Sequence, residues 1–310
     1  MSNVREFFSL PFKVMEVFGL SQDWNSSWIY RVYGFFIHFA FIDLFTLFHF
    51  LFFFHFETIQ ELSDCAGTFL TNFGQVLKTL NWMMKLKSIK KLVISLEELV
   101  SLSEHSSNKG RKKLNIILKR GRFVYTIVYI SAIASCLFAG LVPLLNKKHH
   151  KLAYRMYFPY LDYTNNDVVF VLLAIYQMSP VFICAVTLSL DCIPVFIICF
   201  ATGMIEELSD RMKEIGKKSS VWKISESPRI IHNKQTEKTI MKELLQCIEI
   251  HLKIKELIIG LQSNFSGVIM VQGILSSIIF CTTAFMLSLV SLYLKSLESY
   301  NHDCFRLDNF

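Results

Sequence analysis

The chain has 310 residues, of which 53% are hydrophobic and 29 are Phe, and its net charge is +7. This composition excludes a soluble globular protein, because no charged segment is long enough to form a soluble domain with its own core. The positive charge could suit nucleic acid, but it lies between long uncharged segments, where orientation in a membrane explains it better. Residues 257–294, for example, carry no charged side chain, and about 20 apolar helical residues cross a bilayer. The sequence therefore predicts an all-α, polytopic transmembrane helical bundle, since helices pair their own backbone groups in lipid.

Five membrane spans are expected after an N-terminal segment at residues 1–31. In chain order, the predicted spans are residues 32–54, residues 65–84, residues 123–145, a segment that begins near Val168 and a segment that begins near Phe265. The second span is the least apolar, because Lys78 lies inside it. The fourth apolar segment is longer than a bilayer is thick, and Pro180 and Pro194 are expected to kink it.

The connections between the spans predict the orientation of the bundle. The second and fourth connections are rich in Lys and Arg, whereas the first carries Glu57, Glu61 and Asp64 without any Lys or Arg. Positively charged loops stay on the cytoplasmic side of a membrane. The N-terminus is therefore expected in the cytoplasm, and the first and third connections are expected outside.

The fourth and fifth spans are expected to continue as helices on the cytoplasmic side, over residues 200–262. Hydrophobic side chains recur there every four residues, at Ile240, Leu244, Ile248 and Leu252. This spacing predicts an amphipathic helix. Two protruding helices suggest an assembly surface, with a solvated helical hairpin as the alternative. The bundle would then cover residues 32–294, followed by a polar tail at residues 295–310.

Signals for catalysis are weak. The eight Cys form no C-x-x-C pair, and neither a phosphate-binding loop nor a nucleophile elbow is present. We therefore expect no enzyme, no metal site and no cofactor. Asp43 and Lys78 are ionisable residues within predicted spans, where such residues are costly. They could face each other, or Lys78 could extend its amine toward the cytoplasm.

Aromatic and Met side chains give a clearer functional hypothesis. A cleft that they line, with few polar groups, suits a small apolar ligand. Residues of this kind in the outer halves of the second to fifth predicted spans are Phe69, Phe73, Phe138, Tyr176, Met178, Phe285 and Met286. The alternative for each is an ordinary contact with the core or with lipid.

A spaced pattern leads into and through the fifth predicted span. Its members are Cys247, Ile248, His251, Ile254, Leu261, Phe265, Ser266, Gln272, Ser276, Cys281 and Phe285. The pattern resembles the insect odorant receptor family, whose penultimate long segment carries C-I-x-x-H-x-x-I, then F-S, Q, S and C. Phe158-Pro159, Gln177 and Asp191 resemble further elements of that family.

The resemblance implies a ligand-specific subunit of an odorant-gated, non-selective cation channel. In that family seven helices build each subunit, and a ligand-specific receptor assembles with a shared co-receptor into a hetero-tetramer around one pore. The resemblance also implies a small volatile odorant bound in the outer half of the bundle, and a place in the plasma membrane of olfactory sensory neurons. The cytosolic ends of the later helices would form the assembly region, and the last helix would line the pore.

The sequence predicts five of the seven helices of that family, since residues 295–310 show no further span. We therefore expect a chain of these residues to be incomplete and to conduct no ions, because the resemblance assigns the pore to the seventh helix. A gustatory receptor of the same superfamily, a five-span transporter or membrane enzyme, and a decoy that associates with full-length subunits are the alternatives. No residue pattern indicates which odorant binds.

Overall fold

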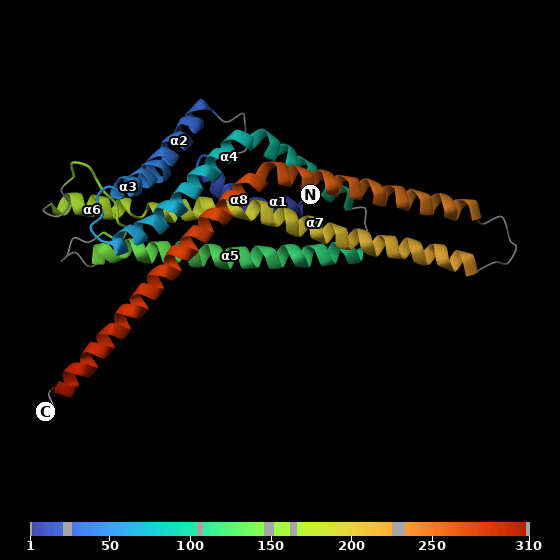
Figure 1. Ribbon diagram of the computed structural model, residues 1–310. Coiled ribbons are helices and arrows are strands. Elements are labelled where there is room, and N and C mark those ends of the chain that lie inside the picture. The colour runs from blue at the N-terminus through green and yellow to red at the C-terminus, as the bar shows by residue number, and fades with distance from the viewer. Residues whose placement is uncertain are drawn as a thin grey trace. The chain divides into compact units, whose positions relative to one another are not determined.

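The computed structural model describes residues 2–20, 27–103, 108–145, 152–161, 166–224 and 233–307 (Figure 1). Its elements, in chain order, are α1 (Ser2–Val17), α2 (Trp28–His38), the π-helix η1 (Phe39–Asp43), α3 (Leu44–Phe52), α4 (Ile59–Ser103), α5 (Asn108–Leu145), α6 (Asp167–Tyr176), α7 (Ser179–Ile224) and α8 (Asn233–Leu307). All elements within these ranges are helical, which confirms the predicted fold class. The predicted amphipathic helix at residues 240–252 lies within α8.

Four helical stretches within the described ranges are long and apolar enough to cross a membrane. They are Trp28–Phe52, Ile116–Val142, Asp167–Lys217 and Glu237–Ser288. These stretches correspond to the first, third, fourth and fifth predicted spans. The architecture is that of a multi-pass helical membrane protein.

The second predicted span, residues 65–84, forms the middle of α4 but is not among these apolar stretches. The physical reason is a set of buried polar side chains, which we call the α4 polar row: Asn72, Gln75, Lys78 and Thr79. The spacing of three to four residues places this row along one side of the helix. The prediction of a helix here is confirmed, but residues 65–84 are not among the four stretches of the described ranges that are long and apolar enough to cross a membrane.

The fourth apolar segment is divided close to the predicted kink at Pro180. α6 ends at Tyr176, Gln177 has left the helical conformation, and α7 begins at Ser179. Pro180 therefore lies in the first turn of α7, where the missing N–H of proline leaves no intrahelical hydrogen bond unmade. Pro194, in contrast, lies inside α7.

The chain divides into two compact units. The first unit comprises residues 1–31, 81–133 and 185–266, and the second comprises residues 32–80, 134–184 and 267–310. The second unit contains the first and third connections, which the sequence predicts to lie on the side of the membrane opposite the cytoplasm. The first unit contains the connections predicted to be in the cytoplasm.

In the first unit, α4 packs on α8. Apolar side chains recur at intervals of three, four or seven residues on the two helices and are buried: Trp82, Ile89, Leu92, Leu96 and Leu99 on α4, and Cys247, Ile250, Ile254, Leu257 and Leu261 on α8. A Cβ atom on Gly260 would lie 2.7 Å from Leu92 Cδ1, so the backbone of α8 closely approaches α4 there. Lys85 Nζ donates a hydrogen bond to Ser263 O at 2.7 Å at one end of this contact.

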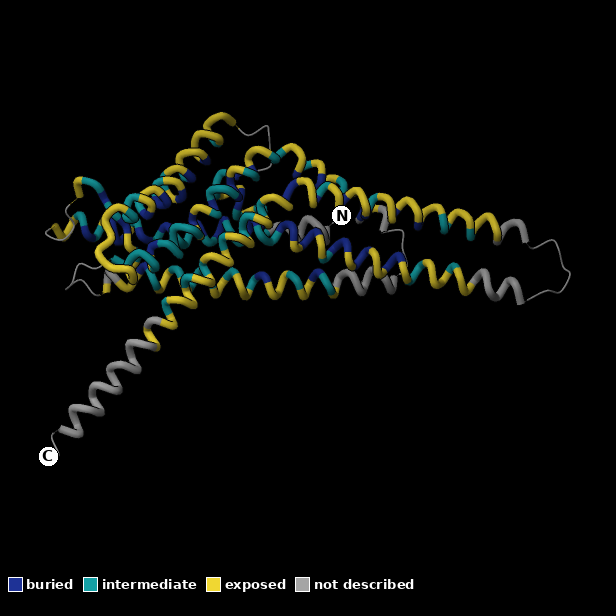
Figure 2. The backbone as a smooth tube through the Cα atoms, viewed as in Figure 1, coloured by how far each residue is buried: buried dark blue, intermediate teal, exposed yellow. Residues whose placement is uncertain are grey.

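Beyond Phe265, no described residue of α8 is buried (Figure 2). Its side chains remain apolar there, as at Ile269, Ile274 and Phe280. A helix that is apolar on its exposed faces suits contact with lipid tails.

Asn264 is expected to carry no glycan, although Asn264-Phe265-Ser266 matches the glycosylation sequon. Its side chain is buried on α8, and Nδ2 donates to Gly260 O at 2.7 Å. Glycosidase treatment of the expressed protein should give no gel shift. Asn25 begins a second sequon and lies outside the described residues, so N25Q and N264Q separate the two positions. A shift abolished by N264Q would contradict the structure, and one abolished by N25Q would contradict the predicted orientation.

Candidate ligand site

Five aromatic side chains, which we call the five-ring cluster, pack together in the second unit: Phe45 and Phe48 on α3, Tyr154 and Phe158 in the connection before α6, and Tyr176 at the end of α6. The ring centroids of contacting pairs lie 4.8 to 6.5 Å apart, a range typical of aromatic packing. Phe45 is fully buried and contacts both tyrosines. Burial raises the pKa of the Tyr154 hydroxyl, so the phenol stays neutral at neutral pH. The cluster offers an uncharged aromatic surface.

The π-helix η1 lies beside this cluster and supplies a hydrogen-bond acceptor to it. The N–H of Leu44 donates to Phe39 O, five residues back, and not to Ala40 O as in an α-helix. Ala40 O accepts a hydrogen bond from Tyr176 Oη at 2.9 Å. Tyr176 is half-buried, and this contact gives its phenol a hydrogen-bond partner and fixes its ring in the cluster.

Gln177 holds the connection before α6 in place. Its Oε1 accepts hydrogen bonds from the backbone N–H groups of Ala153 and Tyr154, at 2.6 and 3.2 Å. Its Nε2 donates to Tyr154 O at 2.7 Å. The side chain is fully buried, and the connection is tied to α3 by a further bond from Tyr157 N to Phe48 O, at 3.2 Å. One amide at the break between α6 and α7 therefore positions Tyr154 of the cluster.

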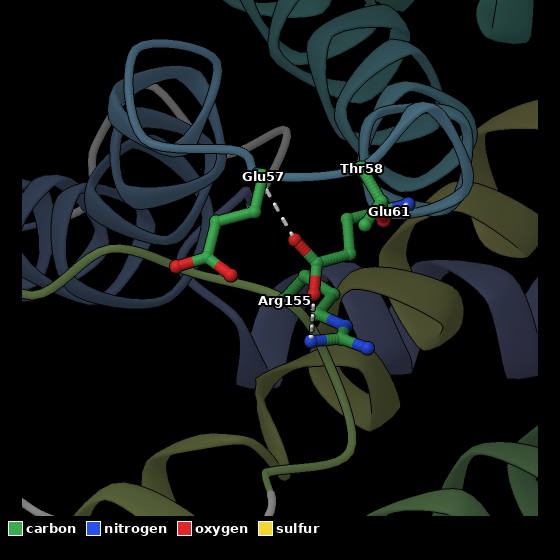
Figure 3. A network of polar contacts seen from close by, with 4 residues as sticks. All are labelled: Glu57, Thr58, Glu61 and Arg155. Atoms are coloured by element: carbon green, nitrogen blue, oxygen red, sulfur yellow. Dashed lines mark hydrogen bonds and ion pairs between the residues drawn. The ribbon is translucent and has the colours of Figure 1, made fainter.

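A charged network fastens the same connection to the start of α4 (Figure 3). Arg155 Nη1 donates to Glu61 Oε1 at 2.8 Å, and Glu61 Oε2 accepts from Glu57 N at 3.2 Å. Thr58 Oγ1 accepts from Glu61 N at 3.2 Å, so Thr58 and Glu61 form a variant of the capping box at the N-terminus of α4. Arg155 is half-exposed, and exposed ion pairs contribute only about 0–1 kcal/mol.

Four further aromatic residues form a second group: Phe50 on α3, Phe53 directly after α3, and Phe69 and Phe73 on α4. The rings of Phe69 and Phe73 stack with centroids 5.8 Å apart. Phe69 also contacts Phe50 at 5.8 Å and Phe53 at 5.3 Å.

The structure places the predicted ligand-site residues in different surroundings. Phe69 and Phe73 belong to the second aromatic group, and Tyr176 belongs to the five-ring cluster. Phe138 is 73% exposed and Phe285 is 58% exposed, as expected of contacts with lipid.

Met178 and Met286 complete the predicted set. Met178 lies against α5, where its Sδ occupies the space that a Cβ atom on Gly140 would need. Met286 is half-buried on α8. The assignment of all seven residues to a ligand site remains a prediction.

Sequence reasoning missed Phe45 and Phe48 as members of the site. Their spacing of three residues places both on one side of a helix, and this was the available signal. Phe158 and Gln177 were noted only as elements of the family resemblance, and their contacts explain why those residue types are used there.

The residues of the family pattern on α8 differ in burial. Cys247 and Phe265 are buried in the first unit. His251, Ser266 and Cys281 are exposed, and Gln272 is half-buried. Cys247 and Phe265 therefore take part in packing.

Polar side chains accompany the aromatic ones in the second unit. The α4 polar row is buried there, and on α3 His49 is fully buried with its ring 4.7 Å from that of Phe45. Asp43, the other ionisable residue noted in the spans, is exposed, whereas Lys78 is buried. No group of three or more His, Cys, Asp or Glu side chains in the described ranges could hold a metal ion.

These features define a multi-pass helical membrane protein with an aromatic candidate ligand site. The chain belongs to the 7tm odorant receptor family, whose sequence model matches residues 58–297. This is a family of receptors and not of enzymes.

Two curated relatives from Drosophila melanogaster are similar to most of the chain. Odorant receptor 33b is 27% identical over 220 residues, which cover 68% of this chain and 50% of the relative. Odorant receptor 22b is 27% identical over 232 residues, which cover 72% of this chain and 53% of the relative. The chain therefore spans about half the length of the curated relatives that it matches.

Proposed function

We propose that the chain is a ligand-specific odorant receptor subunit that detects small apolar volatile molecules. The observation that carries this proposal is the family match over residues 58–297, which covers the members of both aromatic groups that follow residue 58. The rings supply a large apolar contact area, and few polar groups would fix the orientation of a ligand.

The proposed setting is the plasma membrane of olfactory sensory neurons. There the subunit would assemble with the odorant receptor co-receptor into a hetero-tetrameric, ligand-gated cation channel. Residues 1–31 would lie in the cytoplasm, and residues 200–262 would protrude there as the helical ends that contact other subunits. The resemblance to the family supports these assignments, together with the basic connections on that side.

The proposal is tested by co-expression and by ligand binding. The chain should co-purify with an insect odorant receptor co-receptor from detergent-solubilised membranes, whereas an unrelated multi-pass protein should not. In lipid nanodiscs it should bind a fluorescent apolar probe saturably, and apolar volatiles should displace that probe. An absence of saturable binding, compared with empty nanodiscs, would contradict the proposed ligand class.

Tyr176→Ala is expected to weaken the binding of an apolar ligand by about 1–3 kcal/mol, or roughly 10- to 200-fold, because it removes a ring at the centre of the cluster. Phe35→Ala is the matched control, since Phe35 is mostly exposed and is not among the predicted ligand-site residues. Displacement titrations in nanodiscs measure both variants. Tyr176→Phe keeps the ring and separates the aromatic contact from the hydrogen bond to Ala40. An equal effect of the Tyr176→Ala and Phe35→Ala variants would remove Tyr176 from the site.

A further inference from the structure

In the second unit, His49 Nε2 on α3 and Asn72 Nδ2 on α4 are buried polar atoms without a hydrogen-bond partner among the described residues. Both side chains are almost completely excluded from solvent, His49 being 0% and Asn72 4% exposed. Buried polar atoms are nearly always hydrogen-bonded, because leaving one unpaired is costly. In lipid the cost is not relieved by water. This pair therefore points to something that binds between the helices.

The hydrogen-bond role of His49 follows from its other ring nitrogen. His49 Nδ1 lies 2.9 Å from Phe45 O. A carbonyl oxygen can only accept a hydrogen bond, so Nδ1 carries the proton. In a neutral imidazole the second nitrogen is then an acceptor. A neutral ring is the form that suits a fully buried position in a membrane span. His49 Nε2 therefore requires a donor, whereas Asn72 Nδ2 is itself a donor.

The two side chains lie along the same contact between α3 and α4. Cys65 Sγ on α4 donates to His49 O at 3.3 Å. Val76, further along α4, packs against the apolar cluster that contains Phe45. Asn72 lies on α4 between these two contacts and two turns from Cys65, so it shares the face of Cys65. The ring of His49 extends back along α3 toward Phe45, because its Nδ1 contacts Phe45 O.

The surroundings of this pair are apolar and aromatic. His49 packs on Phe45, which contacts Tyr154 and Tyr176 of the five-ring cluster. A molecule that reaches both polar atoms would therefore have an apolar body and one small group that both donates and accepts a hydrogen bond.

We infer that His49 and Asn72 form the polar determinant of the ligand site and select volatile molecules that carry a hydroxyl group, the O–H donating to His49 Nε2 and the oxygen accepting from Asn72 Nδ2. This inference rests on the proposed function. An alkane satisfies neither atom. A ketone accepts from Asn72 but leaves the imidazole nitrogen without a donor. An alcohol or phenol satisfies both, and it does so without bringing a charge into the membrane.

Three ligands of matched size test the inference on the full 310-residue chain in lipid nanodiscs: 1-octanol, 2-octanone and octane, each displacing a fluorescent apolar probe, with empty nanodiscs to correct for partition into lipid. We expect octanol to bind about tenfold more tightly than octanone, and octane more weakly still. Equal affinities of all three would overturn the inference and leave the proposed function intact. A failure of all three to displace the probe would overturn both.

Variants test whether the preference for octanol over octanone depends on the two side chains. His49→Phe keeps an aromatic ring and removes the acceptor, and Asn72→Leu keeps the approximate volume and removes the donor. Each should reduce the preference for octanol over octanone to about twofold or less. His55→Phe is the matched control for the first, because His55 Nδ1 makes the same contact to the carbonyl four residues back but the side chain is exposed. Gln60→Leu, at an exposed amide on α4, is the control for the second.

Retention of the full preference in either His49→Phe or Asn72→Leu would overturn the assignment. Thermal denaturation identifies a variant that fails to fold. In that case the comparison of octanol with octanone on the unmodified chain remains decisive, since it needs no substitution. A loss of stability in both variants without any change in ligand preference would assign the two atoms to a buried water, and it would overturn the ligand role.

Discussion

Replacing Phe45 by alanine is expected to destabilise the folded bundle by about 3–5 kcal/mol, the range for removing a fully buried phenylalanine ring. The ring contacts His49, Tyr154 and Tyr176 and is completely buried. Within a membrane the loss is one of packing, because lipid tails are as apolar as the protein interior and cannot refill the space without reordering the helices. SDS-induced unfolding in mixed micelles measures the change.

Phe35→Ala is the matched control for this substitution. Phe35 lies on α2 and is 68% exposed, so its ring is in contact with lipid in the proposed membrane orientation. Its removal should change the free energy of unfolding by no more than about 0.5 kcal/mol. Equal losses for Phe35→Ala and Phe45→Ala would show that the five-ring cluster is not packed as described.

Gln177→Leu is expected to release the connection before α6 from the bundle. The substitution keeps the approximate volume but removes the partners of Ala153 N, Tyr154 N and Tyr154 O. Unpaired buried groups cost about 1–3 kcal/mol each, so a total of about 3 kcal/mol is a low estimate. The open form of the connection should then be about 100-fold more populated.

Trypsin detects this opening, because Arg155 lies within the connection and is half-exposed. The initial rate of cleavage after Arg155 should rise in proportion to the open population. Glu61→Gln is the control, since it removes only the exposed ion pair with Arg155 and should increase cleavage by less than about fivefold. Similar rates for the Gln177 and Glu61 variants would mean that the buried amide does not hold the connection.

The helices themselves could be predicted because the signal for each one, a long apolar segment, lies within its own sequence. A long apolar segment has one way to pair its backbone in lipid, and Pro180 marks the division between α6 and α7 within its own sequence neighbourhood. Residues 65–84 show the limit of this reasoning. Their helix was predicted, but the burial of its polar side depends on partners that local hydropathy does not describe.

The candidate site depends on contacts between distant segments, so it was predicted only in part. Phe35 and Phe45 are both phenylalanines of the first predicted span, yet one is exposed and the other is fully buried. Only the packing of α3 against the connection before α6 distinguishes them. Tyr176 was predicted on composition alone. Its hydrogen bond to Ala40 depends on the π-helix η1, which no sequence pattern predicted.

The α4 polar row has a further consequence for how the chain is made. A lysine at the centre of a spanning helix disfavours release from the translocon into lipid by about 2.5–3.5 kcal/mol, and Asn72 and Gln75 add to the effect of Lys78. The segment that becomes α4 is therefore a poor insertion signal by itself. The preceding span, Trp28–Phe52, is strongly apolar and only residues 53–58 separate it from α4. During synthesis the two segments would leave the translocon as a helical hairpin, in which the earlier helix shields the polar side of the later one from lipid.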